Sequence, residues 1–278
     1  MHPEQQLSIA RNSEGATSMA VISQVGGALD KLSLGGIPII DSSGVLGIES
    51  MFFGSVLAPW PNRIANHSYS FSGQAYSTPN IDADNNSNHG LISDRELELI
   101  AHLPDRLELG YQFGQDASYP FDVKLSITYE VFEDFLRVTA IADNRGRTAP
   151  FGLGFHPYFL AGENFRVSAN FTKKIIANDR MIPTSQIDIS GFEYVGGAID
   201  DCFAGAKQAL LETDHASVTI SLEKGFEYFM LYRPNDGGKS LLAIEPMSCL
   251  ANAFNSDLPS VILEAGAKKE YAFSIRMH

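Results

Sequence analysis

The sequence predicts an all-β protein, a large antiparallel β-sandwich with few short helices, and three observations carry that prediction. Apolar and polar residues alternate with a period of two in many segments, which is typical of strands with one buried face. Turn signals rich in glycine, proline and asparagine separate those segments. Long amphipathic helical windows are nearly absent. Many short strands joined by such turns indicate two packed antiparallel sheets.

The clearest alternation predicts a series of strands. They are 107–113 (LELGYQF), 123–131 (VKLSITYEV), 136–141 (LRVTAI), 218–222 (VTISL) and 271–277 (YAFSIRM). Turns are expected at the glycine pairs that begin at 26 and 35, at SSG from 42, at NRG from 144 and at NDGG from 235. Because no compositional break marks a linker, residues 1–278 are expected to form a single domain.

Composition limits the classes of partner. The chain of 278 residues is long enough to bury a substantial core, and 44% of its residues are hydrophobic. The 33 acidic residues exceed the 20 basic residues, which gives a formal net charge of −13. This balance argues against nucleic acid or an anionic membrane surface as a partner, because both are bound by clustered Lys and Arg. The expected assembly is a monomer or a homodimer.

Cysteine usage and hydropathy predict the location. Cys202 and Cys249 are far apart and lack metal-ligand spacing, so two free thiols in a reducing compartment are expected. No basic start precedes an apolar run at the N-terminus, and no window approaches the roughly 18 apolar residues of a membrane span. The cytoplasm is therefore the expected location.

A histidine and a glutamate are the candidates for chemistry. His156 lies in FGLGFHPYF, where Pro157 biases it toward extended geometry at a strand end. Glu245 follows four apolar residues in LLAIEPM, so its carboxyl group must be paired, hydrogen-bonded or shifted in pKa. Together they are candidates for a general acid/base pair across a sandwich face. A buried histidine with satisfied hydrogen bonds is the alternative interpretation.

Two loops offer polar groups for a ligand. Asn62 and Arg63 lie in LAPWPNRIANHSYSFSG, where Trp60 is a candidate for stacking against a sugar ring; a surface arginine in a rigid loop is the alternative. The polar segment 80–88 is unusually long for a compact domain and is followed by His89. Long loops on rigid β scaffolds are often functional.

Taken together, these segments resemble the aldose 1-epimerases, also called galactose mutarotases. The matching motifs fall in the family's order from about residue 54 to 255, and five in order are specific although each alone is weak. They are PWPNRIANHSYSFSGQAY, NSNHG, GFHPYF, IDDCF and AIEPMSCLANAFN. The resemblance implies a galactose mutarotase-like sandwich with no metal and no cofactor, in agreement with the strands read from the alternation.

The resemblance also implies roles for individual residues in anomer interconversion of a free hexose. Glu245 would be the general base and His156 the general acid in opening and reclosing the ring. Nearby carboxylates would raise the pKa of His156, and burial would increase the basicity of Glu245. The residues implied to hold the sugar are Asn62, Arg63, His89 and Asp200, with Glu227 where the family often has glutamine, and Trp60, Tyr158 or Phe159 to cover its apolar faces.

Departures from the family pattern leave the preferred sugar open. HGL stands where many members have HGG, Asp201 stands where a histidine is common, and LAN replaces the usual residues before Ala253. These positions surround the implied pocket, so whether Asp200 or Asp201 contacts substrate is also open.

Three alternatives remain beside a neutral hexose as substrate. A glycoside hydrolase or lyase would use Glu245 with Asp200 or Asp201 as a carboxylate pair. A non-catalytic sugar-binding module would keep the pocket without turnover. A phosphorylated or sulfonated hexose would require a cationic clamp, for which the candidates are Lys173, Lys174 and Arg180.

Overall fold

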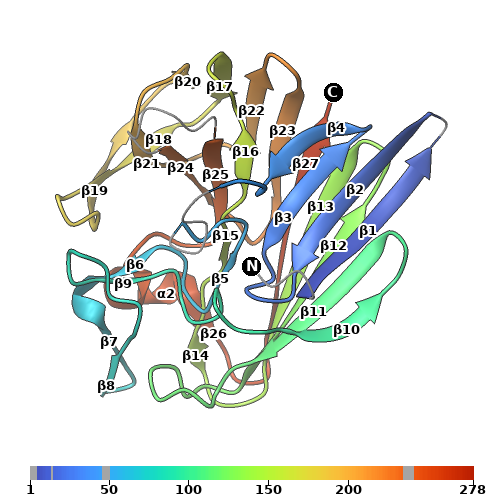
Figure 1. The fold of residues 1–278 in the computed structure, drawn as a ribbon. Helices are drawn as coiled ribbons and strands as arrows, with labels where there is room; N and C mark the ends of the chain where they lie inside the picture. The colour runs from blue at the N-terminus through green and yellow to red at the C-terminus, as the bar shows by residue number, and fades with distance from the viewer. Residues whose placement is uncertain (1–4, 14, 46–50, 234–240) are drawn as a thin grey trace.

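Two large antiparallel sheets dominate the computed structural model, which describes residues 5–13, 15–45, 51–233 and 241–278 (Figure 1). The nine-stranded sheet has the order β10 (Glu98–His102), β11 (Arg106–Gln112), β12 (Val123–Val131), β13 (Phe135–Asn144), β27 (Lys268–Met277), β23 (Ser217–Lys224), β22 (Gln208–Thr213), β17 (Phe165–Ala169) and β20 (Phe192–Tyr194). The eight-stranded sheet has the order β19 (Pro183–Asp188), β18 (Lys173–Ala177), β21 (Ile199–Ala204), β24 (Tyr228–Arg233), β25 (Leu241–Met247), β15 (Gly154–Phe155) and β5 (Val56–Leu57), with β16 (Tyr158–Leu160) also paired to β25.

Smaller elements complete the described part of the chain. An N-terminal four-stranded sheet contains β1 (Gln6–Ser13), β2 (Ala16–Ser23), β3 (Leu29–Leu34) and β4 (Ile37–Asp41). Two-stranded pairs are formed by β6 (Arg63–Ile64) with β9 (Ser87–Asn88), β7 (Ser68–Phe71) with β8 (Gln74–Ser77), and β14 (Ala149–Pro150) with β26 (Ile262–Leu263). The helices are short: η2 (Ala65–His67), α1 (Ala253–Ser256) and α2 (Leu258–Val261). No helix among the described residues is long and apolar enough to cross a membrane.

The predicted all-β sandwich is confirmed, and each strand expected from the alternation lies within an observed strand apart from Phe113, which follows the end of β11. In β12, buried and partly buried residues alternate along the whole strand. The expected turns at 26, 35, 42 and 144 connect or end strands as predicted, whereas the NDGG turn from 235 lies outside the described residues.

Aromatic side chains join the two large sheets into one core. The rings of Phe155 on β15 and Phe273 on β27 lie 5.0 Å apart, and Phe226 contacts Phe273 at 5.9 Å. Each such buried ring contributes roughly 1.5–3 kcal/mol through the area removed from water. The sandwich therefore forms a rigid support for its loops.

Strand register in the eight-stranded sheet decides which residues share a face. Cys202 pairs with Met230, and Met230 pairs with Glu245, so these three side chains project to the same side. The opposite side carries Phe203 and Phe229, which belong to the hydrophobic core. Glu245 thus projects away from the core, toward the segments that cover the other face of the sheet.

Candidate active site

The two candidates for chemistry lie side by side. Nε2 of His156 is 3.4 Å from Oε1 of Glu245, and their side chains are only 5% and 2% exposed. His156 is held between β15 and β16 because its N–H donates to the carbonyl oxygen of Ser55 and its carbonyl oxygen accepts from the N–H of Gly54. Residues 89 positions apart in sequence are thereby brought into one buried pair.

Spaced glycines let the strand before His156 pass close to its neighbours. A Cβ atom at Gly152 would lie 2.6 Å from Sγ of Cys249, and one at Gly154 would lie 2.8 Å from Cβ of Pro61. Both distances are shorter than real contacts allow, so no larger side chain fits. The FGLGFHP pattern therefore packs the segment just before His156 against the loop that carries Pro61 and Asn62.

Asn62 and His89 are joined by reciprocal bonds. The Asn62 N–H donates to Nδ1 of His89 at 3.3 Å, and the His89 N–H donates to the carbonyl oxygen of Asn62 at 2.9 Å. Both residues have positive φ, 55° and 59°, a conformation that is uncommon for non-glycine residues and clusters at functional sites. The His89 ring lies 5.2 Å from the His156 ring, and burial lowers the pKa of His89.

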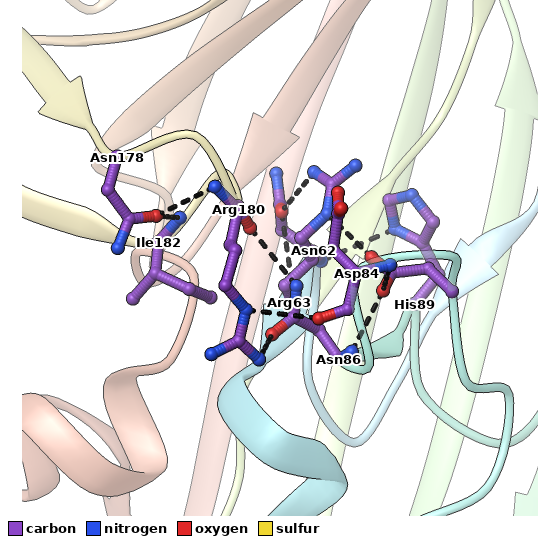
Figure 2. A network of polar contacts seen from close by, with 9 residues as sticks. Asn62, Arg63, Asp84, Asn86, His89, Asn178, Arg180 and Ile182 are labelled. Atoms are coloured by element: carbon purple, nitrogen blue, oxygen red, sulfur yellow. Dashed lines mark hydrogen bonds and ion pairs between the residues drawn. The ribbon is translucent and has the colours of Figure 1, made fainter.

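Arg63 is oriented by the polar loop that precedes His89. Its Nε donates to Oδ2 of Asp82 at 3.0 Å, and its Nη1 donates to Oδ1 of Asn62 at 3.3 Å (Figure 2). Partial burial acts to raise the pKa of Asp82, but bonds from the Asn86 backbone and Arg63 leave it below its ordinary value. Asp82 was missed by sequence reasoning, although it starts the DADNN run that is typical of a carboxylate-capped turn.

The two adjacent aspartates on β21 face opposite sides of the sheet. Asp200 pairs with Tyr232, which pairs with Ala243, two residues from Glu245, so Asp200 shares the face of Glu245. The Asp201 side chain projects to the opposite face of the sheet, where it accepts a 2.7 Å hydrogen bond from Nζ of Lys174. Burial raises the pKa of Asp200, whereas Asp201 is held in an ion pair.

A pocket of about 210 Å³ lies on the face of the sheet that carries Asp200, and its lining includes Asn62 but not His156 or Glu245. Its polar lining includes Asn62 and Asp200, and its apolar lining includes Met181, Pro183, Met230 and Met247. Lys174 and Asp201 also border the pocket from β18 and β21, although their side chains project to the opposite face of the sheet. Met230 on β24 is paired with Glu245 on the adjacent strand β25, so the pocket wall at Met230 lies beside Glu245.

Burial disfavours both charged forms of the pair. It raises the pKa of Glu245 well above the ordinary value, with the nearby Asp200 charge adding to the rise. It also lowers the pKa of His156 to about 3, so the expected rise for this histidine is wrong in direction. Oε2 of Glu245 is buried without a hydrogen-bond partner among the described residues, which leaves it available to accept from a ligand hydroxyl.

Several aromatic candidates support the site from within the core. Tyr158 stacks on the His156 ring at 4.8 Å with an interplanar angle of 13°, and its hydroxyl donates to the carbonyl oxygen of Met51. Phe159 is fully buried. Trp60 is 2% exposed and packs against Phe254, so it offers no ring face to a sugar, unlike the sequence-based expectation.

The remaining candidates lie in ion pairs or loops. Glu227 is exposed and forms an ion pair of 2.8 Å with Lys207, and it does not line the pocket. Lys173 is paired with Asp188 within its own hairpin. Cys202 and Cys249 are free thiols, and the described residues contain no cluster of three or more His, Cys, Asp or Glu side chains that could hold a metal.

The chain belongs to the aldose 1-epimerase family, whose model matches residues 10–276. Among curated proteins, it is similar to the uncharacterized protein YihR of Escherichia coli K12, with 27% identity over 276 residues that cover 92% of this chain and 89% of the relative. Its fold is similar to that of the GalM/aldose epimerase homologue from C. elegans, with a TM-score of 0.82, 18% identity, and 98% of each chain covered. It is likewise similar to galactose 1-epimerase from Lactobacillus acidophilus, with a TM-score of 0.79, 17% identity, and coverage of 96% and 92%.

Proposed function

We propose that this protein is an aldose 1-epimerase that interconverts the α and β anomers of a free hexose. The observation that carries the proposal is the buried contact of 3.4 Å between His156 and Glu245. Anomerisation needs a base at the C1 hydroxyl and an acid at the ring oxygen. Because both oxygens are bonded to the same carbon, the acid and the base must lie close together, as these two side chains do.

In the proposed mechanism, Glu245 removes the proton of the C1 hydroxyl while His156 protonates the ring oxygen. The C1–O5 bond breaks and the C1–O1 bond becomes a carbonyl. Rotation about the C1–C2 bond presents the other face of the aldehyde, and the two residues exchange roles as the ring recloses. Each group contributes on the order of 10² to 10⁴ in rate.

The pair needs only one proton for this cycle. In the empty site burial favours the protonated carboxyl of Glu245 and the neutral imidazole of His156. A sugar hydroxyl that donates to Oε2 of Glu245 would stabilise the carboxylate, and the proton would then pass to His156. Proton transfer over 3.4 Å within the pair thus prepares the acid and the base together.

The surrounding groups support a neutral sugar as substrate. The charges of Arg63 and Lys174 are matched by Asp82 and Asp201, and Asp200 adds an acidic group to the same face as Glu245. A phosphate or sulfonate would meet these carboxylates without a free cation among the described residues that line the pocket. Asp200, Asn62, Arg63 and His89 are proposed to bind hydroxyls, which are both donors and acceptors.

Polarimetry on freshly dissolved α-D-galactose, α-D-glucose, a 6-phosphorylated hexose and a sulfonated hexose tests the proposal. The wild type should accelerate anomerisation of a neutral hexose, and Glu245→Gln and His156→Asn should each lower kcat by about 10² to 10⁴. Glu223→Gln is the matched control, because Glu223 lies on β23 of the other large sheet and is paired with Arg137 on β13.

Two results would contradict the proposal. Wild-type turnover in Glu245→Gln or His156→Asn would remove the acid/base mechanism. Acceleration restricted to the phosphorylated or sulfonated sugar would keep the reaction and overturn the neutral substrate.

A further inference from the structure

Arg180 lies in the turn that joins β18 and β19 at the outer edge of the eight-stranded sheet (Figure 1). Asn178 fixes this turn, because its Oδ1 accepts from the N–H groups of Arg180 and Ile182 at 3.0 and 3.1 Å. The Met181 N–H also donates to the carbonyl oxygen of Asn178. The guanidinium therefore projects from a defined backbone position (Figure 2).

The Arg180 side chain connects this turn to two remote segments. Its Nε donates to the carbonyl oxygen of Asp84 at 3.0 Å, and its Nη2 donates to Oδ1 of Asn66 and of Asn86 at 3.0 and 2.9 Å. Asn86 returns a bond from its Nδ2 to the carbonyl oxygen of Arg180 at 3.0 Å. These acceptors are uncharged oxygens, so the geometry is that of a structural connection and not of an ion pair.

One of the two segments held by Arg180, the loop that contains Asp84 and Asn86, also orients Arg63. The backbone N–H groups of Asp84 and Asn86 donate to Oδ1 of Asp82 at 3.0 and 2.8 Å. The other carboxylate oxygen of Asp82 accepts from Nε of Arg63. A continuous series of hydrogen bonds thus runs from the β18–β19 turn to the guanidinium of Arg63.

The same turn also forms part of the pocket wall. Met181 and Pro183 line the pocket from the hairpin, and Asn62 lines it from the loop that precedes β6. Arg180 joins the hairpin to the loop between β8 and β9, which pairs with β6. Its bonds therefore fix both the orientation of Arg63 and the separation of two pocket walls.

We infer that Arg180 is a positioning residue for sugar binding, an inference that rests on the proposed function. It acts through Asp82 and the loop 80–88 and touches no reacting atom. Its loss is expected to weaken substrate binding more than the chemical step, because His156 and Glu245 are held by other strands.

The kinetic test compares Arg180→Ala, Arg180→Lys and Lys173→Ala on the best neutral hexose. Arg180→Ala should raise KM about tenfold, which corresponds to about 1.4 kcal/mol, and change kcat less than about threefold. Lysine retains the charge but cannot span all three acceptors, so Arg180→Lys should recover part of the affinity. Lys173→Ala should leave both constants unchanged, because Lys173 on the same hairpin is paired within it to Asp188.

A double-mutant cycle tests the route through Asp82. If Arg180 acts through Asp82, the increases in KM for Arg180→Ala and Asp82→Asn should combine to clearly less than their product. Hydrogen exchange should rise in residues 80–88 of Arg180→Ala, a change that can be measured without turnover.

The outcomes separate this inference from the proposed function. If the wild type is active and Arg180→Ala has an unchanged KM, the inference about Arg180 fails while the proposed function stands. The same holds if the KM increase of the double variant equals the product of the increases in Arg180→Ala and Asp82→Asn. If Arg180→Ala loses activity only on a phosphorylated or sulfonated hexose, Arg180 is a ligand of the substrate, and the inference that it is a positioning residue is also overturned. A wild type that neither binds nor anomerises any sugar would overturn both, even if exchange in residues 80–88 rises as expected.

Discussion

Gly90, which follows His89, is the position where a single methyl group should disturb the site most directly. Its φ is +75°, and a Cβ atom there would lie 2.2 Å from the carbonyl oxygen and 2.5 Å from the carbonyl carbon of Ala58. That carbonyl oxygen accepts a 2.8 Å bond from the Leu91 N–H, so the two segments cannot separate without losing it. Gly90→Ala must therefore move backbone beside His89.

The loss of unfolding free energy in Gly90→Ala has two parts, which the control variant Gly73→Ala separates. Positive φ in an alanine costs roughly 1–2 kcal/mol. Displacement of packed backbone adds to this, so Gly90→Ala is expected to lose at least about 3 kcal/mol of unfolding free energy. Gly73, in the turn between β7 and β8, has φ +79°, and no atom of the described residues lies within 4 Å of the position that a Cβ atom would take, so Gly73→Ala should lose only the first part.

Urea unfolding measures both variants. The midpoint should fall clearly further for Gly90→Ala than for Gly73→Ala, with an unchanged slope. Gly90→Ala should also raise KM, because His89 and its bond with Asn62 are displaced. Equal stability losses in the two variants would show that the close approach to Ala58 carries no cost, and the reasoning would fail.

Three further predictions concern the titratable side chains. Asp200→Asn should raise KM about tenfold, whereas Asp201→Asn, on the opposite face, should leave it within about twofold in the same steady-state assay. Burial raises the pKa of Glu245 and lowers that of His156 to about 3, so below pH 4.5 the unfolded chain holds two protons on this pair and the folded chain holds one. The contribution of the pair to stability should therefore fall as the pH drops from about 4.5 toward 3. In His156→Asn the unfolded chain loses the proton of Glu245 above about pH 4.5 while the folded chain keeps it, because burial raises the pKa of this carboxyl group. The unfolding free energy from urea titrations should therefore fall as the pH rises from about 4.5, by up to about 1.4 kcal/mol per pH unit. Glu227→Gln should change neither KM nor kcat beyond about twofold, because Glu227 is exposed, and a large effect in polarimetry would place it in the site.

Local patterns predicted the strands because successive side chains of a strand project to opposite faces, so apolar and polar residues alternate when one face is buried. The alternating residues 123–131 form β12 without a shift of either end. His156 and Glu245 could be singled out for a similar reason, because a titratable group at the end of an apolar run needs a partner. That they are partners of each other depends on the pairing of β15 and β16 with β25, which no local pattern specifies.

Side-chain direction was beyond local reasoning. Trp60 beside two prolines resembles an exposed loop residue, yet it packs against Tyr69 on β7 and Phe254 on the short helix α1. The neighbouring Asp200 and Asp201 could not be distinguished until the register of β21 with β24 was known. The bond between Arg63 and Asp82 likewise depends on the pairing of β6 with β9.

The central place of β27 has a consequence for how the molecule is made. This strand lies between β13 and β23, so the nine-stranded sheet remains two separate halves until residues 268–277 are available. Synthesis proceeds from the N-terminus, and pairing between distant segments is slow. A nascent chain on the ribosome therefore carries the complete pair His156 and Glu245 before the sheet behind it can close. Until then the facing edges of β13 and β23 lack their shared partner strand, and unpaired strand edges are prone to pair with other chains.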